Sequence, residues 1–98
     1  MSGGYFDSIS CIQNTIEDLE LLIKNNNSEE IDEWGDTVGH FFSEKTITEF
    51  KNAIYYLERA YIYAHRIDYL MCGDDIEESF HSRLQENLNE QLKEYNHD

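Results

Sequence analysis

The sequence predicts an all-α fold, a compact bundle of three to four helices, and three observations support this prediction. The 98 residues contain no proline, which would interrupt helices. The apolar residues recur at intervals of three and four, the period of one helix face. The sequence shows no alternation of apolar and polar residues, which would indicate a strand. It also shows no Asn-Gly type turn between two such stretches, which would indicate a hairpin. The length suits a single acidic helical domain covering residues 1–98.

The first helix is predicted to run from Phe6 or Asp7 to Lys24. Its apolar residues form one stripe: Ile9, Ile12, Ile16, Leu19 and Ile23. Three consecutive asparagines, residues 25–27, follow Lys24 and end the helix.

The next segment, from about Glu29 to Phe42, is predicted to form one helix or two short ones. Its apolar side would carry these residues: Ile31, Trp34, Val38, Phe41 and Phe42. Gly35 and Gly39 weaken a helix here by up to about 1 kcal/mol each relative to alanine. A break near Gly35 and a continuous helix whose glycines permit close backbone approach are both kept open.

A long helix is predicted from Thr46 to Met71 or Cys72, because Thr46 and Glu49 have the spacing of a capping box. Its apolar face is wide, which suits a central helix that is contacted on two sides. Gly73 supplies a left-handed stop after it.

The last helix is predicted to begin with Asp75 as its cap and Glu78 three residues later. Its apolar stripe is Ile76, Phe80, Leu84, Leu88 and Leu92. The turn at Gly73 is short, so the last two long helices are expected to lie antiparallel.

Charge is the strongest functional signal in the chain. There are 21 acidic and 7 basic residues, a formal net charge of -14, and Lys24 is the single Lys or Arg in residues 1–44. Such a chain is not expected to bind nucleic acid or an anionic membrane directly, because the charge has the wrong sign. The predicted partner is a basic nucleic-acid-binding protein or nuclease complex, since these carry the largest cationic surfaces in a cell.

Two acidic clusters are the predicted partner-binding residues, with Trp34 or a tyrosine of the long helix as a desolvated anchor. The first cluster is Glu29, Glu30, Asp32, Glu33, Trp34 and Asp36. The second is Asp74, Asp75, Glu77 and Glu78. The alternative is that acids gather at helix N-termini because the helix dipole attracts them, which explains the clusters in part but not the total charge.

Five of the seven tyrosines lie on the predicted long helix. One ribbon of that helix carries Tyr56, Arg59, Tyr63 and Arg66. This ribbon can cover the edge of the core, seal a homodimer, form a protein interface, or stack a base and clamp a phosphate. It is therefore kept as an alternative ligand-binding or dimer surface.

No catalytic residue, metal site or cofactor is predicted. The chain has no Gly-rich phosphate loop, no nucleophile elbow and no zinc-protease motif. Its two Glu-x-x-His units, Glu78 to His81 and Glu94 to His97, lie on one terminal segment, whereas a di-iron bundle needs them on separate helices. Solvated helix surface accounts for them.

The expected location is the cytoplasm of a bacterial host cell. The N-terminal residues lack the basic and then apolar pattern of a signal peptide, and no apolar run reaches the length of a membrane span. Cys11 and Cys72 are predicted to be buried thiols, which suits a reducing compartment.

In its small size, strong acidity and proline-free helical pattern, the whole chain resembles the phage-encoded anti-defence proteins, including nucleic-acid-mimicking anti-CRISPR and anti-restriction inhibitors. The resemblance is one of class and rests on no family motif. It implies a phage or prophage origin and a CRISPR effector or restriction nuclease as target. The predicted function is a non-enzymatic inhibitor whose carboxylates stand in for DNA phosphates in the groove of its target.

Other functions are kept as alternatives. An immunity protein or antitoxin would use the same acidic surface to cap a nuclease toxin. An oligomeric sponge would sequester a nucleotide second messenger on the ribbon of Tyr56, Arg59, Tyr63 and Arg66, completed by a second subunit. A structural or adaptor module would bind other helices and have no inhibitory role.

Overall fold

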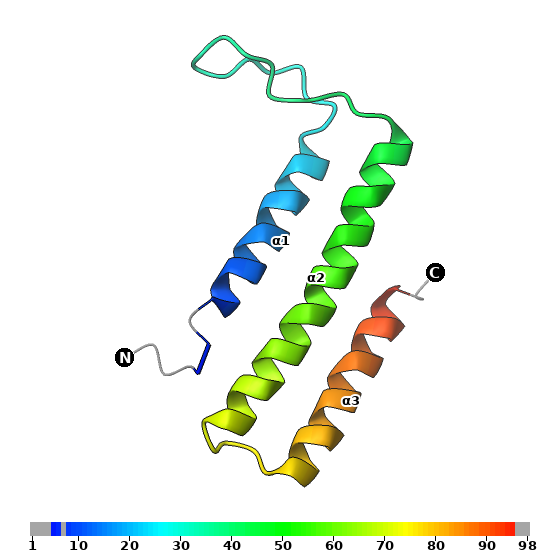
Figure 1. The fold of residues 1–98 in the computed structure, drawn as a ribbon. Helices are drawn as coiled ribbons and strands as arrows, with labels where there is room; N and C mark the ends of the chain where they lie inside the picture. The colour runs from blue at the N-terminus through cyan, green and yellow to red at the C-terminus, as the bar shows by residue number, and fades with distance from the viewer. Residues whose placement is uncertain (1–4, 7, 96–98) are drawn as a thin grey trace.

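The structure, a computed structural model, describes residues 5, 6 and 8–95 and contains three helices (Figure 1). They are α1 (Ile9–Lys24), α2 (Glu44–Met71) and α3 (Glu77–Tyr95). Within the described residues no strand forms, and Ile31 and Thr37 make an isolated antiparallel bridge. The all-α prediction is confirmed.

The helices lie side by side in one layer, with α2 between α1 and α3 (Figure 1). In that view α1 and α3 ascend and α2 descends. Both outer helices contact α2, but in the part of the chain that the structure describes they do not contact each other. The principal extents are 52 × 38 × 15 Å, so the layer is about one helix thick.

This open layer differs from the compact bundle predicted. The radius of gyration is 17.4 Å, against about 13 Å for a compact domain of this length. The buried apolar residues are Ile54 on α2 and Leu88 on α3, and no large apolar side chain among the described residues is fully buried. The reason is that α1 and α3 each contact α2 and meet no second helix.

The ends of α2 are set by a serine and a glycine. Ser43 is the N-cap, because its Oγ accepts a hydrogen bond from the backbone N–H of Thr46 at 3.4 Å. The helix therefore begins slightly before the predicted capping box. Gly73 follows the other end with a φ of +84°, the left-handed stop that the sequence predicted.

Residues 25–43 form a loop, and the helix or helices predicted for Glu29 to Phe42 are wrong. Buried Asn26 anchors the loop, because its side-chain oxygen accepts from the N–H of Phe42 at 2.9 Å and its amide donates to the Phe42 carbonyl at 3.1 Å. Gly39 donates its N–H to the Ser28 carbonyl at 3.1 Å. A Cβ on Gly39 would lie 2.5 Å from that oxygen, so the close approach requires glycine.

Cys11 and Cys72 are exposed, so the prediction of buried thiols is wrong. Cys11 lies on α1 outside the apolar stripe that faces α2, and Cys72 caps the C-terminal end of α2. The Cys72 thiol donates to Asp68 Oδ1 at 3.7 Å. Desolvation and the Asp68 carboxylate raise the pKa of the Cys72 thiol above its usual value.

Candidate protein-binding surfaces

The acidic loop, residues 28–43, is closed by backbone hydrogen bonds. The N–H of Val38 donates to the carbonyl of Glu30, and the N–H of Asp32 donates to the carbonyl of Asp36, both at 2.8 Å. The Asp32 carboxylate also accepts from the N–H groups of Trp34 at 2.9 Å and Asp36 at 3.0 Å. Asp32, predicted to contact a partner, is half-buried and holds the turn.

Trp34 stands at the tip of the acidic loop with 78% of its surface exposed. The exposed carboxylates of the same loop are Glu29, Glu30, Glu33 and Asp36. Ile31 and Phe41, also in the loop, are 62% and 53% exposed. Leaving large apolar side chains in water forgoes about 1.5–3 kcal/mol each, so this surface gains from being covered. An aromatic anchor within a charged rim is the composition of a protein interface.

The second predicted cluster lies at the opposite end of the layer, in the turn from α2 to α3 (Figure 1). Its exposed acids are Asp74, Glu77 and Glu78. Asp75 is different, because its side chain is 0% exposed and forms ion pairs with Arg83 at 2.8 Å and Arg66 at 3.6 Å. The two clusters therefore do not form one patch, and Asp75 presents no carboxylate to a partner.

The start of α3 also differs from the prediction that Asp75 caps it. Ser79 Oγ accepts from the N–H of Ile76 at 3.1 Å and donates to Asp75 Oδ1 at 3.2 Å. Ser79 thus satisfies the N–H of Ile76, the residue just before α3, and the Asp75 carboxylate turns inward to the two arginines.

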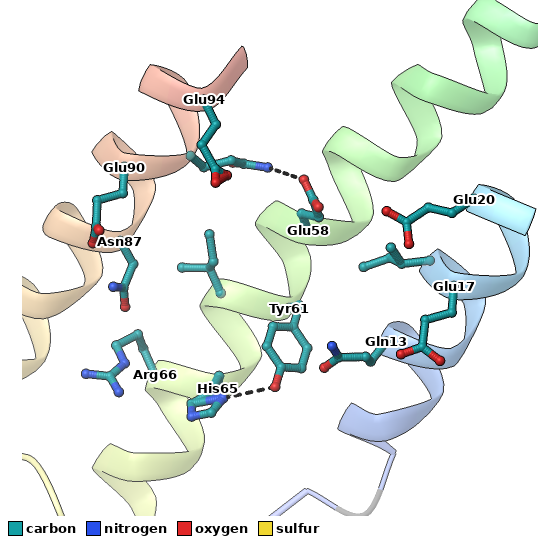
Figure 2. A pocket seen from close by; sticks show the side chains of 13 residues that line it. Gln13, Glu17, Glu20, Glu58, Tyr61, His65, Arg66, Asn87, Glu90 and Glu94 are labelled. Atoms are coloured by element: carbon teal, nitrogen blue, oxygen red, sulfur yellow. Dashed lines mark hydrogen bonds between the residues drawn. The ribbon is translucent and has the colours of Figure 1, made fainter. Parts of the chain in front are cut away.

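A groove of about 530 Å³ opens on one face of the layer, over α2 and between the outer helices (Figure 2). Its carboxylates come from all three helices: Glu17 and Glu20 on α1, Glu58 on α2, and Glu90 and Glu94 on α3. Tyr61 and His65 of α2 lie at its base, with 3.4 Å between the Tyr61 hydroxyl and His65 Nδ1. Among the described acids, ion pairs form at Asp75 alone, so no carboxylate of the groove is ion-paired.

Glu58 links the groove to the end of α3. Its Oε1 accepts a hydrogen bond from the Tyr95 hydroxyl at 2.6 Å. Burial and this bond to a carboxylate raise the pKa of the Tyr95 phenol well above its usual value. Sequence reasoning did not identify the groove as a site. The available signal was acid spacing, since Glu17 and Glu20 are three apart and Glu90 and Glu94 four apart, which puts each pair on one helix face.

The tyrosine and arginine ribbon of α2 is divided by the fold. Tyr56 and Tyr63 are 67% and 44% exposed. Arg59 instead turns toward α3 and donates to Gln91 Oε1 at 3.2 Å. Arg66 is held by Asp75 and lies over the Tyr69 ring, 4.6 Å from its centroid. The two phenols therefore face solvent while the two guanidinium groups serve the packing of α2 against α3.

Within residues 5, 6 and 8–95, no three His, Cys, Asp or Glu side chains are grouped so as to hold a metal ion. None of the described helices is both long and apolar enough to cross a lipid bilayer.

Comparison of the chain with protein-family models, with curated proteins and with solved structures found no match. The candidate function therefore rests on the acidic loop, the groove and the exposed face of α2.

Proposed function

We propose that this chain is a non-enzymatic inhibitor that binds a basic nucleic-acid-binding protein through the acidic loop. The observation that carries the proposal is Trp34, 78% exposed at the tip of a loop with four exposed carboxylates and no Lys or Arg. Tryptophan is the residue most enriched among interface hot spots, and the carboxylates would steer a cationic partner toward it. The partner should offer an apolar pocket within a basic rim.

A nucleic-acid groove that also exposes apolar or aromatic side chains meets this requirement. Carboxylates of Glu29, Glu30, Glu33 and Asp36 would occupy positions that DNA phosphates take in the target, and Trp34 would fill the space of a base. The resemblance to phage anti-defence proteins adds to this proposal a phage or prophage origin, action in the cytoplasm of a bacterial host, and a CRISPR effector or restriction nuclease as target. An immunity protein would use the same surface against a nuclease toxin.

The nucleotide-sponge alternative has less support. It needs Arg59 and Arg66 to face a ligand together with Tyr56 and Tyr63. Both guanidinium groups are instead bonded at the α2–α3 contact. A phosphate would have to displace these bonds before it could bind.

The test is affinity capture from a bacterial lysate followed by inhibition of the captured protein. The loop variant carries Glu29→Lys, Glu30→Lys and Glu33→Lys, and it leaves Asp32 in place because Asp32 holds the turn. The matched control makes the same charge change in the groove, with Glu17→Lys, Glu20→Lys and Glu90→Lys. A third variant, Trp34→Ala, removes the anchor without changing charge.

The loop variant should lose the partner, and Trp34→Ala should weaken binding by about 30-fold or more, as expected for a hot-spot tryptophan. The control should keep most of its binding, and duplex DNA should displace the partner from the parent protein. Trp34 is the single tryptophan, so its fluorescence reports the contact directly. Full capture and inhibition by a loop variant of native helicity would refute the proposal.

A further inference from the structure

The face of α2 opposite the groove carries an apolar seam that is exposed at its centre and half-buried at its two ends. The seam residues are Ala53, Tyr56, Ala60, Tyr63, Ile67 and Leu70. They are spaced three, four, three, four and three apart, the heptad spacing of a helix that packs along another helix. At 100° per residue they lie on the far side of α2 from its groove residues, Tyr61 and His65. Tyr56, Ala60 and Tyr63 are exposed.

A single layer of helices leaves more surface in water than a stable monomer does. The chain exposes 7469 Å². A folded monomer of 11.6 kDa is expected to expose about 5,800 Å², so the excess is about 1,600 Å². A standard interface buries about 800 Å² per partner, and permanent homodimers bury more. The excess therefore matches what one chain loses to a permanent partner.

We infer that a second copy of this chain packs on the seam and supplies the missing second layer. Domains are built from at least two packed layers around a core, and this chain forms one. The partner that covers the seam must be present whenever the chain folds, and a second copy of the chain meets this condition. None of the six seam residues is charged, so two seams can meet without repulsion between them. If two copies met through their groove faces instead, ten carboxylates would be brought together.

The seam is also self-complementary, as a two-fold interface requires. Its first four residues alternate between small and large, with Ala53 and Ala60 beside Tyr56 and Tyr63. With antiparallel α2 helices and the two-fold axis near Ala60, Ile67 lies opposite Ala53 of the partner subunit. Ala60 then lies beside Ala60 of the partner subunit, so the two helices can approach closely at the axis. The inference does not depend on the proposed function, since the acidic loop lies at one end of the layer (Figure 1).

The test measures molar mass by sedimentation equilibrium and contact by cysteine cross-linking. Ala60→Lys places a charge in the seam, and Gln13→Lys adds the same charge at an exposed groove position of α1. For cross-linking, Ala60→Cys and Gln13→Cys are each made in a chain that also carries Cys11→Ser and Cys72→Ser. Mild oxidation then joins only cysteines that meet across the two-fold axis.

The parent and Gln13→Lys should have twice the mass of one chain at micromolar concentration. Ala60→Lys should weaken the dimer by at least about 100-fold, because two unpaired ammonium groups would be buried together. If Ala60→Lys also unfolds the chain, cross-linking decides: Ala60→Cys should form covalent dimers and Gln13→Cys should not. A parent that is helical and monomeric at tens of micromolar would overturn the inference. A dimer that tolerates Ala60→Lys and does not cross-link at position 60 would also overturn it. The finding that the captured basic protein, and no second copy, covers the seam would overturn it as well.

Discussion

The substitution Asp75→Asn should destabilise the protein strongly although it changes one terminal group. The Asp75 side chain is 0% exposed and pairs with Arg83 at 2.8 Å and Arg66 at 3.6 Å. Arg66 is itself only 13% exposed. An asparagine of the same size would remove the negative charge and direct N–H groups toward guanidinium donors. Two cations would then lie close together without a counter-ion.

The magnitude follows from burial. Breaking a buried ion pair by removing one partner costs about 3–5 kcal/mol. Arg83 is 57% exposed and can be hydrated, so the lower figure, about 3 kcal/mol, applies. A domain of this length has about 5–15 kcal/mol of stability in total. Asp75→Asn should therefore raise the unfolding constant on the order of 100-fold.

The assay is urea unfolding followed by far-UV circular dichroism, at equal protein concentration because a dimer makes stability concentration-dependent. The matched control is Asp74→Asn, the same substitution at the exposed neighbouring residue, which should change stability by less than about 0.5 kcal/mol. With an m-value of about 1–3 kcal/mol/M, the midpoint for Asp75→Asn should fall by at least about 1 M. Equal midpoints for the two variants would show that the buried ion pairs contribute nothing to stability.

Two further substitutions test the loop and the end of α3. Gly39→Ala should cost about 1–3 kcal/mol in urea unfolding and weaken partner binding, because its Cβ would lie 2.5 Å from the Ser28 carbonyl. Thr37→Ala, at an exposed position of the same loop, is the control, and equal losses for the two would contradict this account. Because the folded-state pKa of Tyr95 is raised, folded Tyr95 keeps its proton at a pH where the unfolded phenol loses it, so stability should fall as pH rises above about 10. Tyr95→Phe should lack that part of the fall between about pH 9 and about pH 11, measured by urea midpoints, and identical pH profiles for parent and variant would exclude the role given to Tyr95.

The helices could be predicted from the sequence because their determinants are local. The spacing of apolar residues in α1 and α2, and the glycine that ends α2 at Gly73, depend on a few consecutive positions. The acidic loop could not be predicted from the sequence, because the apolar residues from Glu29 to Phe42 have helical spacing. What prevents a helix is the long-range anchoring of Phe42 by Asn26, sixteen residues away.

The candidate binding residues could be predicted only where their exposure does not depend on contacts between distant parts of the chain. Trp34 and the acids beside it were identified as contact residues, and the structure leaves most of them exposed. Asp75 was assigned with its acidic neighbours, although its burial depends on Arg66, nine residues earlier, and Arg83, eight residues later. The groove needed the packing of three helices, because its carboxylates are distributed along the sequence from Glu17 to Glu94.

Salt should act in opposite directions on the two proposed interfaces. Two chains that each carry a formal charge of -14 repel one another, and the seam attracts without charge. Raising NaCl from about 0.05 to about 0.5 M shortens the screening length from well above 10 Å to a few ångströms, so the dimer should tighten. The same change should weaken a cationic partner bound by the acidic loop, since that contact depends on charge attraction. The lysine variant of Glu29, Glu30 and Glu33 should bind no partner at either salt concentration, whereas its dimer should still tighten with salt, less steeply than the parent because the chain is less negative. If both affinities moved in the same direction with salt, the seam and the acidic loop would not be separate surfaces, because one would then contain the charges assigned to the other.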